Sequence, residues 1–289
     1  NSWYFNHLFM NTDNNQEINL NRQLLLYIPT YNCADYIVGV IDEIPEKFWE
    51  IADILIVDNC STDETVERIQ DARSANRWPN QVHLVQPSIN LGYSGSQKLA
   101  YGIALDSPNV QHVIMLHGDG QYPPDLLNLF LPYTGSEYGV VYGFRDKSIY
   151  PEKEETPPFT YWVIKLLSLI ESLVTGHKRK EWHNGFVMYS RGFLSKVNLR
   201  ALTGTYHIDG HIQFVAGELN EPVLAVPIWK RYKNSKRPGF NRLTYIFHVL
   251  SMMIRFRVLG SGQTDTESSS LKYGYSYFPS PCDSFDEIS

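Results

Sequence analysis

The chain has 289 residues, 43% of them hydrophobic and 19% charged, which is typical of a globular protein with a well-buried core. Its net charge of −6 argues against a general nucleic-acid-binding protein, so no nucleic-acid partner is predicted. The three cysteines lack the spacing of a metal site, and their odd number argues against a disulfide framework and favours a reducing compartment. No signal peptide and no membrane-spanning segment are predicted, because the longest apolar stretches are short and interrupted by charge.

Composition divides the chain into three parts. Residues 1–21 are polar and Asn-rich and are expected to form a flexible N-terminal segment. Residues 261–289 have the Ser, Pro and acidic bias of a weakly ordered C-terminal tail. A single catalytic domain is expected between them, over residues 22–260.

Within this domain, short apolar runs alternate with helical patterns. The runs predict strands at 24–29, 53–58, 81–86, 112–116 and 139–144, and the intervening segments predict helices at 34–48, 61–72, 94–106 and 123–131. Continuous apolar strands separated by helices are typical of parallel strands that are covered on both faces. The predicted fold class is therefore α/β, with an open doubly wound, mostly parallel sheet and helices on both faces.

Polar residues follow four of these strands. Since ligands of such sheets bind outside the carboxyl ends of the strands, these segments are the first candidates for a site. They read PTYN (29–32), DNCSTD (58–63), NLGYSGS (90–96) and HGDGQ (117–121). NLGYSGS does not match the dinucleotide or phosphate-loop motifs, so it is either a plain loop or a place where backbone approaches a ligand.

Two carboxylates stand at these strand ends. Asp58 is expected to accept a hydrogen bond from a nucleobase or ribose; the alternative is an Asx-turn or a helix N-cap. Asp119 is expected to bind a divalent cation together with substrate phosphates, with Gly118 and Gly120 leaving room for a diphosphate. If this segment stays extended, His117 points the same way, where it would bind a ribose or join the metal shell and favour Mn²⁺. The alternative is a strand-end histidine that caps backbone.

These strand ends, in this order, resemble the family-2 inverting glycosyltransferases with the GT-A fold. The chain reads IPTYNC, IVDNCSTD, NLGYSGS and HGDGQYPPD, followed by NGFVMYSRGFL and VLAVPIWKRYKNSKRPGF. The resemblance covers about residues 24–257 and looks closest to the branch of dolichyl-phosphate mannose synthase and the polyprenyl-phosphate glycosyltransferases. Three departures stand out: His117 and Asn59 replace aspartates, and the aspartate expected before GFV is missing, with Trp182, His183 and Asn184 in its place.

The resemblance implies a metal-dependent inverting transferase that uses Mg²⁺ or Mn²⁺. It would move a sugar from a GDP- or UDP-linked nucleotide sugar to a lipid phosphate, such as polyprenyl phosphate, or to a glycan. The metal ligands would be Asp119 and His117. The substrate-binding residues carried over are Pro29, Tyr31, Asp58, Asn90, Gly92, His117, Gln121, Arg231, Lys233 and Lys236. The ordinary alternative for the three cations is a solvated basic surface.

A hydroxyl acceptor would need a general base, for which Asp209 and His183 are the candidates, with His211 as a third. An anionic lipid phosphate would need no strong base.

Residues 159–180 form an apolar helical stripe that ends in His-Lys-Arg-Lys, which fits either an interfacial helix or a core helix. The predicted location is cytoplasmic. If this helix is interfacial, the protein would lie peripherally on the inner face of the membrane.

Two other functions compete with this one. A sugar-phosphate nucleotidyltransferase would want a basic, Gly-rich loop after the first strand, and PTYNCADY contains no cation. A non-catalytic nucleotide-sugar-binding protein of the same fold is the second alternative, and it rests on the His117 and Asn59 departures.

Overall fold

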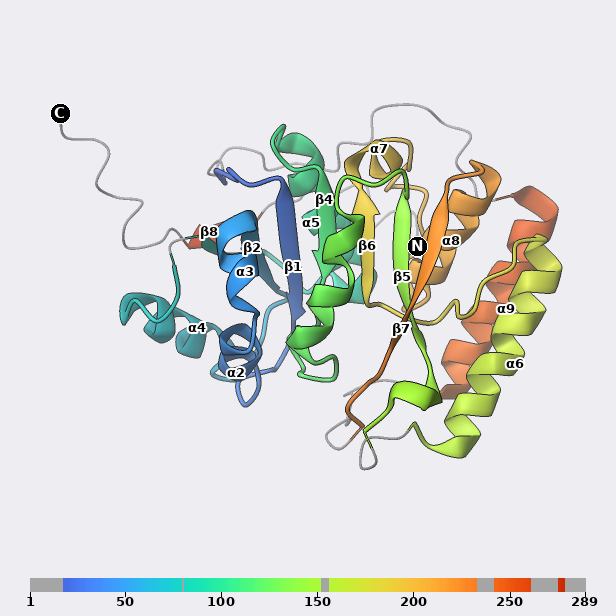
Figure 1. Ribbon diagram of the computed structural model, residues 1–289, viewed down its shortest axis with the longest axis horizontal. Coiled ribbons are helices and arrows are strands. Elements are labelled where there is room, and N and C mark those ends of the chain that lie inside the picture. The colour runs from blue at the N-terminus through green and yellow to red at the C-terminus, as the bar shows by residue number, and fades with distance from the viewer. Residues whose placement is uncertain (1–17, 80, 152–155, 233–241, 261–274, 279–289) are drawn as a thin grey trace.

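An eight-stranded sheet forms the centre of the computed structural model, in the order β7-β5-β6-β4-β1-β2-β3-β8 (Figure 1). The structure describes residues 18–79, 81–151, 156–232, 242–260 and 275–278. The strands are β1 (Leu24–Thr30), β2 (Ala52–Asp58), β3 (Val82–Pro87), β4 (His112–Met115), β5 (Val140–Arg145), β6 (Val187–Ser190), β7 (Val223–Ile228) and β8 (Tyr275–Phe278). Only β6 and β8 pair antiparallel to their neighbours. The predicted α/β fold with a mostly parallel sheet is confirmed.

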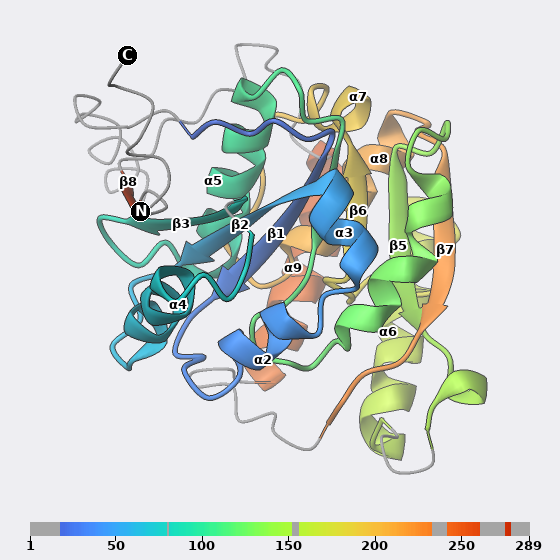
Figure 2. The same ribbon diagram turned by 60° about the vertical axis from the view of Figure 1, so that its left-hand side comes forward.

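Helices cover both faces of the sheet. One face carries α2 (Ile37–Asp42), α3 (Glu46–Ile51), α4 (Thr65–Ser74) and the 3-10 helices η1 (Pro124–Leu129) and η2 (Leu131–Tyr133). The other carries α5 (Gly92–Asp106), α7 (Arg191–Leu194) and α8 (Ile208–Glu218). Figure 2 shows α2, α3 and α4 in front of β1 and β2, with α5 behind them.

The side chains of β1 show why its sequence is apolar throughout. Leu25 and Tyr27 belong to the core on the α5 side, whereas Leu24, Leu26 and Ile28 belong to the core on the α2 side. Successive side chains of a strand point to opposite faces, so a strand covered on both faces needs an apolar residue at every position.

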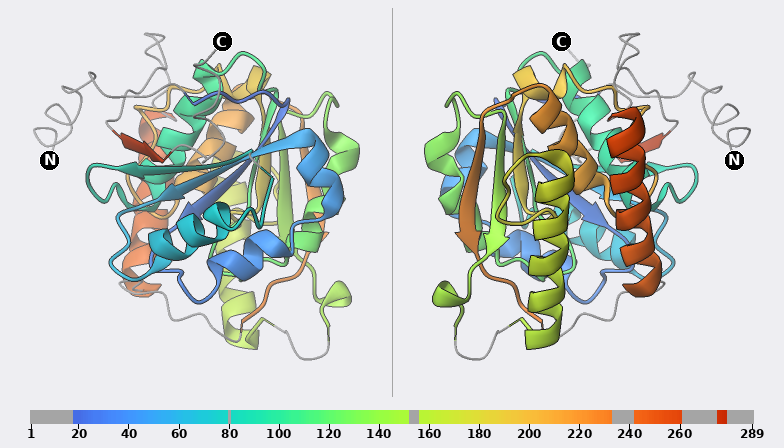
Figure 3. Two further views of the ribbon diagram at one scale, coloured as in Figure 1. Left: turned by 90° about the vertical axis from the view of Figure 1, so that its left-hand side faces the viewer. Right: turned by 90° about the vertical axis from the view of Figure 1, so that its right-hand side faces the viewer.

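Two helices lie outside this sandwich. The helices α6 (Pro158–Thr175) and α9 (Arg242–Leu259) pack side by side beyond β5 and β7 (Figures 1 and 3). Their inner faces share a third core with Trp182 and Phe214. Among the described residues, no helix is both long enough and apolar enough to cross a membrane.

Local structure differs from the prediction in three places. The helix predicted at 34–48 is split into α2 and α3, because Pro45 has no N–H and its ring clashes with the preceding turn, so it can only stand before α3. The segment predicted as a helix at 123–131 forms 3-10 turns instead. No strand was predicted after residue 144, yet β6, β7 and β8 follow. β8 lies within the predicted tail, whose other residues, like residues 1–17, lie outside the described part of the chain.

Candidate active site

The carboxyl ends of β1, β2 and β4 meet at one edge of the sheet. Thr30 is paired with Asp58, and Tyr27 with Met115, so the polar segments that follow these strands begin side by side. Two backbone hydrogen bonds extend the pairing beyond the strands, from Asn59 N to Thr30 O (2.8 Å) and from Gly118 N to Pro29 O (3.2 Å). The edge predicted to bind ligand is therefore built from segments that are far apart in sequence. Tyr31 is exposed there, while Pro29 is half-buried.

Asp58 is fully buried and is held by its own neighbours. It accepts hydrogen bonds from the backbone N–H of Ser61 (3.0 Å), from Ser61 Oγ (2.5 Å) and from Gln86 Nε2 (2.7 Å). This is the turn geometry that the sequence left open as the alternative to ligand binding. A carboxylate has about four acceptor sites, so three bonds leave room for one from a ligand. A ligand role for Asp58 remains a proposal.

Asn59, which departs from the family pattern, ties the end of β2 to the start of α5. Its Nδ2 donates to Asn90 Oδ1 (2.9 Å), and its Oδ1 accepts from Leu91 N (2.8 Å). Asn90 Oδ1 also accepts from the N–H of Gly92, which has a φ of 68°. An ionised Asp can only accept, so the amide makes a pair of bonds that the family's aspartate could not make.

The HGDGQ loop does not stay extended. The prediction that His117 and Asp119 point the same way depended on an extended segment, so it no longer holds. Gly118 and Asp119 lie in a turn, and Gly120 has a φ of 69°. A Cβ on Gly118 would lie 2.9 Å from Thr30 Oγ1 and 3.2 Å from Pro29 O, so Gly118 is required by packing against β1 rather than by a diphosphate. Gly120 is required by its backbone conformation.

Asp119 is half-buried, and Oδ1 accepts a hydrogen bond from Gln121 N (3.0 Å). Within the described part of the chain this is its one hydrogen bond, which leaves Oδ2 for a cation. A carboxylate oxygen is the donor that Mg²⁺ and Mn²⁺ prefer, and imidazole is tolerated better by Mn²⁺ than by Mg²⁺. The residues therefore fit such an ion through Asp119, with phosphates completing the shell.

His117 is linked to Asp209 through Tyr93. Tyr93 Oη lies 3.5 Å from His117 Nε2 and donates to Asp209 Oδ2 (2.9 Å), while Gln97 Nε2 donates to Asp209 Oδ1 (3.2 Å). Burial, with the nearby charge of Asp209, raises the pKa of Tyr93 well above its ordinary value, so its proton stays in place. One of the two predicted bases is thus connected to the HGDGQ loop. The third candidate, His211, instead accepts a hydrogen bond from Thr203 N (3.0 Å).

The loop before β6 closes over the same histidine. A Cβ on Gly185 would lie 2.5 Å from Tyr93 Oη and 2.7 Å from His117 Nε2. Next to it, Asn184 is 1% exposed, and its Oδ1 accepts from Tyr122 Oη (3.0 Å) and Phe186 N (2.9 Å). Its Nδ2 makes no hydrogen bond within the described residues. Neither residue was predicted as part of the site, although both stand in the NGF motif.

We expect Gly185→Ala to impair the site more than the fold. The added methyl must displace His117 or the Tyr93 hydroxyl, whereas the strands around it are unchanged. The expected result is a fall of at least about tenfold in turnover, since a displacement near 1 Å can cost 100-fold, with an overpacking cost of about 1–3 kcal/mol in stability. Steady-state kinetics and urea unfolding measure the two effects. Gly204→Ala, where a Cβ meets no atom within 4 Å, is the matched control; equal losses in both variants would contradict the prediction.

The basic segment after β7 is hydrogen-bonded to the HGDGQ loop. Arg231 N donates to Gln121 O (2.8 Å), and the side chain of Arg231 pairs with Glu43 (3.2 Å). Lys230 is buried, with Nζ 4.5 Å from the centre of the Tyr122 ring. Two cations thus lie beside the loop that carries Asp119. The predicted residues Lys233 and Lys236 lie outside the described residues.

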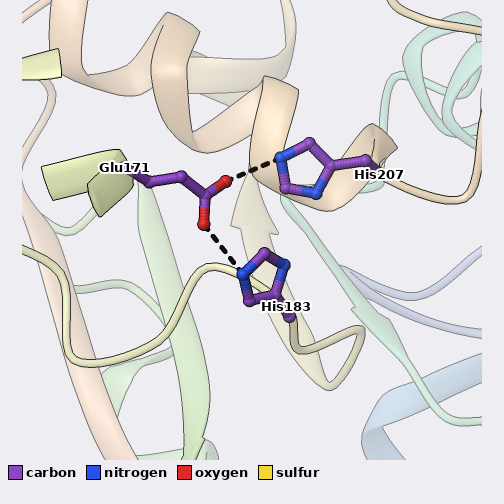
Figure 4. Close-up of side chains that lie close together, drawn as sticks. All are labelled: Glu171, His183 and His207. Carbon is purple, nitrogen blue, oxygen red and sulfur yellow. Dashed lines mark ion pairs between the residues drawn. The ribbon is translucent and has the colours of Figure 1, made fainter. Parts of the chain in front are cut away.

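The second predicted base, His183, turns away from this edge. Its Nε2 lies 2.8 Å from Glu171 Oε2, and His207 Nε2 lies 2.8 Å from Glu171 Oε1 (Figure 4). Burial raises the pKa of Glu171, but His183 and His207 lower it further, to about 2. Burial lowers the pKa of His207. His183 is therefore placed in a buried cluster with Glu171 and His207.

A carboxylate does precede the GFV motif, one position before Trp182. Glu181 is fully buried and accepts from the backbone N–H of Arg145 (2.8 Å), from Arg145 Nε (2.8 Å) and, at a shorter distance, from Nη2. Arg145 also donates to Tyr232 Oη and His183 O (both 3.0 Å). The family's carboxylate was expected where Trp182, His183 and Asn184 stand, and Glu181 lies one position before them. The pair anchors the loop that carries Asn184 and Gly185.

A parallel sheet with an acidic loop, a basic segment and buried polar side chains at its carboxyl edge is the arrangement of an α/β enzyme that binds its ligand at the strand ends. The chain belongs to glycosyl transferase family 2, whose sequence profile matches residues 26–197, more than half of its length. It is thus a glycosyltransferase. No curated protein matches the sequence.

Solved structures show the same fold. One is glucosyl-3-phosphoglycerate synthase from Mycobacterium tuberculosis in complex with Mn²⁺, UDP and glucosyl-3-phosphoglycerate. It is 15% identical to this chain and has a TM-score of 0.56, and the match covers 90% of this chain and 88% of that chain. The complex with Mn²⁺, UDP and phosphoglyceric acid is 14% identical, with a TM-score of 0.58 over 90% and 87%. A structure described as a mycobacterial protein is 15% identical, with a TM-score of 0.54 over 82% and 73%. The GT-A-like fold is confirmed.

Proposed function

We propose that the protein transfers a sugar, with inversion, from a nucleotide sugar to a lipid phosphate, and that a divalent cation at Asp119 is required. One observation supports the nucleotide-sugar donor site. Asp119 keeps one carboxylate oxygen available, and the basic segment after β7 is hydrogen-bonded to the loop that carries Asp119. The solved relatives bind UDP and Mn²⁺, which supports a UDP-linked donor ahead of a GDP-linked one. Family membership favours sugar transfer over the nucleotidyltransferase alternative.

The remaining predicted residues keep their roles as proposals. The base and ribose would lie against the ends of β1 and β2 and the start of α5, with the diphosphate between the HGDGQ loop and the basic segment. The residues assigned to this donor site are Pro29, Tyr31, Asp58, Asn90, Gly92, His117, Asp119, Gln121 and Arg231. A bound cation would offset the charge that develops on the leaving diphosphate, and Arg231 of the basic segment would contribute a second positive charge.

The acceptor half rests on the outer surface of α6 and α9, which we call the apolar platform. Its members are Phe159, Trp162, Leu166, Leu169 and Leu173 of α6 with Phe247, Leu250, Ile254, Val258 and Leu259 of α9. The five residues of α6 recur every three or four positions, so they form one stripe, and each is more than half exposed. The inner faces of both helices are apolar as well.

Soluble proteins rarely expose an apolar surface of this kind without a function for it. Exposed cations lie in or next to the same two helices, Lys178 and Lys180 just after α6 and Arg255 and Arg257 in α9, and would meet anionic headgroups as the apolar residues enter the lipid. A membrane surface is therefore the proposed partner, and the acceptor is a lipid phosphate held there. Its oxygen is already anionic, so no general base is needed, and Asp209 acts as a positioning residue for Tyr93.

Two linked measurements test the proposal. The protein should sediment with anionic vesicles at low salt and be released as the ionic strength rises. The double variant Leu166→Glu, Leu173→Glu should reduce sedimentation by at least tenfold, because two charges are placed in the lipid-facing stripe. The control is Leu129→Glu, at an exposed leucine of η1, which should not change sedimentation.

Nucleoside diphosphate release from UDP- and GDP-sugars should require Mg²⁺ or Mn²⁺ and be stimulated by polyprenyl phosphate in the vesicles.

The other acceptors give different results. Transfer to a soluble phosphorylated acid or a glycan, with no sedimentation at low salt, would overturn the lipid acceptor and leave the donor half standing. Absence of release with every donor and acceptor would favour the non-catalytic binding protein.

A further inference from the structure

Glu171, His183 and His207 form a closed cluster away from the donor site. Glu171 lies in α6, His183 in the loop before β6, and His207 directly before α8. One ligand atom from each lies within 4.8 Å of the other two, and their side chains are at most 3% exposed. Figure 4 shows the carboxylate of Glu171 facing both imidazole rings, with one oxygen directed toward each.

The contacts inside the cluster are short, but they are not ordinary hydrogen bonds. Each Nε2 lies 2.8 Å from a different oxygen of Glu171, yet all four atoms are buried without a hydrogen bond of normal geometry within the described residues. A ring N–H aimed at an oxygen at this distance would form one. Unpaired polar atoms are costly to bury, and one cation between the carboxylate and the two rings would satisfy all four atoms together.

Tyr245 of α9 explains how both rings are oriented. Its Oη lies 2.8 Å from His183 Nδ1 and 3.4 Å from His207 Nδ1. A phenol oxygen that accepts from both Nδ1–H groups leaves each Nε2 with a lone pair directed toward Glu171. Metal-binding imidazoles are held in this way, with the second ring nitrogen donating to a fixed acceptor.

We propose that Glu171, His183 and His207 bind one divalent transition-metal ion, with Zn²⁺ fitting the donor set best. Two imidazoles and a carboxylate favour zinc over Mg²⁺ or Ca²⁺, which prefer oxygen ligands alone. The two Glu171 oxygens and the two Nε2 atoms supply four donors, so the site is closed and structural. It is distinct from the cation site at Asp119 and does not depend on the proposed sugar transfer.

The ion would connect the apolar platform to the active-site edge. It would join α6 to the segment before α8 and to the loop in which Gly185 packs against His117. His183 is then a metal ligand rather than a general base. The Arg145–Glu181 pair holds the start of this loop, and an ion would hold it again at His183. Both attachments would fix the loop where Gly185 meets His117 and Tyr93.

The test is metal content and stability of the purified full chain. After dialysis with Zn²⁺ and then against Mg²⁺-containing buffer, the wild-type protein should retain about one zinc ion per chain by mass spectrometry. Restoring zinc to chelator-stripped protein should raise Tm by about 10 °C at a free concentration a thousand times Kd. Co²⁺ in place of Zn²⁺ should give the visible absorption of a low-coordinate site with nitrogen ligands.

Variants assign the ion to the cluster. Glu171→Gln and His207→Gln should each lose at least nine-tenths of the retained zinc and the Co²⁺ spectrum, whereas Asp119→Asn and the matched control His248→Gln should keep both. Equal zinc content in His207→Gln and wild type, or loss of zinc from Asp119→Asn alone, would overturn the proposal. If the cluster variants do not fold, a wild-type protein whose Tm is the same with and without zinc overturns it equally.

Discussion

Replacing Asp119 by Asn should remove most of the metal-dependent sugar transfer while leaving the protein folded. The substitution removes the charge that would hold the cation, and electrostatic stabilisation by a catalytic metal is worth several kcal/mol, with a tenfold loss of rate for each 1.36 kcal/mol. Turnover should therefore fall on the order of 1,000-fold. Tm should hardly change, because Asp119 is half-buried and Asn keeps the oxygen that accepts from Gln121 N.

The measurement is nucleoside diphosphate release at a series of Mg²⁺ and Mn²⁺ concentrations, with Tm recorded for each protein. Wild type should bind the ion weakly alone and tightly with nucleotide, since one carboxylate leaves the phosphates to complete the shell. Asp125→Asn is the control, because it makes the same change in charge at an exposed position six residues away. Full metal-stimulated activity in Asp119→Asn would mean that the catalytic cation is held elsewhere.

The half of the fold that carries the donor site could be predicted because its signals are local. The apolar runs before Thr30, Asp58 and His117 predict strands buried on both faces. The polar residues that follow these runs predict the edge of the sheet where ligands bind. The break between α2 and α3 is also marked in the sequence, by Pro45, which cannot continue a helix. In contrast, β6 and β7 are short segments whose pairing with β5 is decided by the tertiary fold.

The interior of the site could not be predicted, because its contacts join residues far apart in sequence. Tyr93 meets Asp209 across 116 positions, and Arg145 meets Glu181 across 36. Glu171, His183 and His207 come from three separate parts of the chain, α6, the loop before β6 and the segment before α8, and only the fold brings them together. Side-chain direction also depends on local backbone: the turn at Gly118 separates His117 from Asp119, which an extended strand end would have kept on one side.

The largest loss of stability is expected from Glu181→Gln. Both carboxylate oxygens accept from Arg145, and both residues are buried, so the amide that replaces one oxygen would face an N–H group instead. Removing one partner of a buried ion pair leaves the other charge uncompensated and costs about 3–5 kcal/mol. At about 2–4 °C per kcal/mol, Tm should fall by roughly 10 °C. The exposed pair Arg68–Glu64 is the control, and Glu64→Gln should cost less than about 1 kcal/mol.

The dependence on pH separates the ion pair from packing. Burial raises the pKa of Glu181, but the charge of Arg145 lowers it further, so the folded-state pKa lies below the ordinary value of 4.5. A carboxyl whose pKa is lowered by folding stabilises the protein above its unfolded-state pKa and ceases to do so as the pH falls through the folded-state pKa. Urea unfolding should therefore show the full difference between wild type and Glu181→Gln at pH 7, and a shrinking difference below about pH 4.5. A difference that stayed constant down to acid pH would show that the substitution disrupts packing, and that the charge of Glu181 contributes nothing to holding the active-site loop.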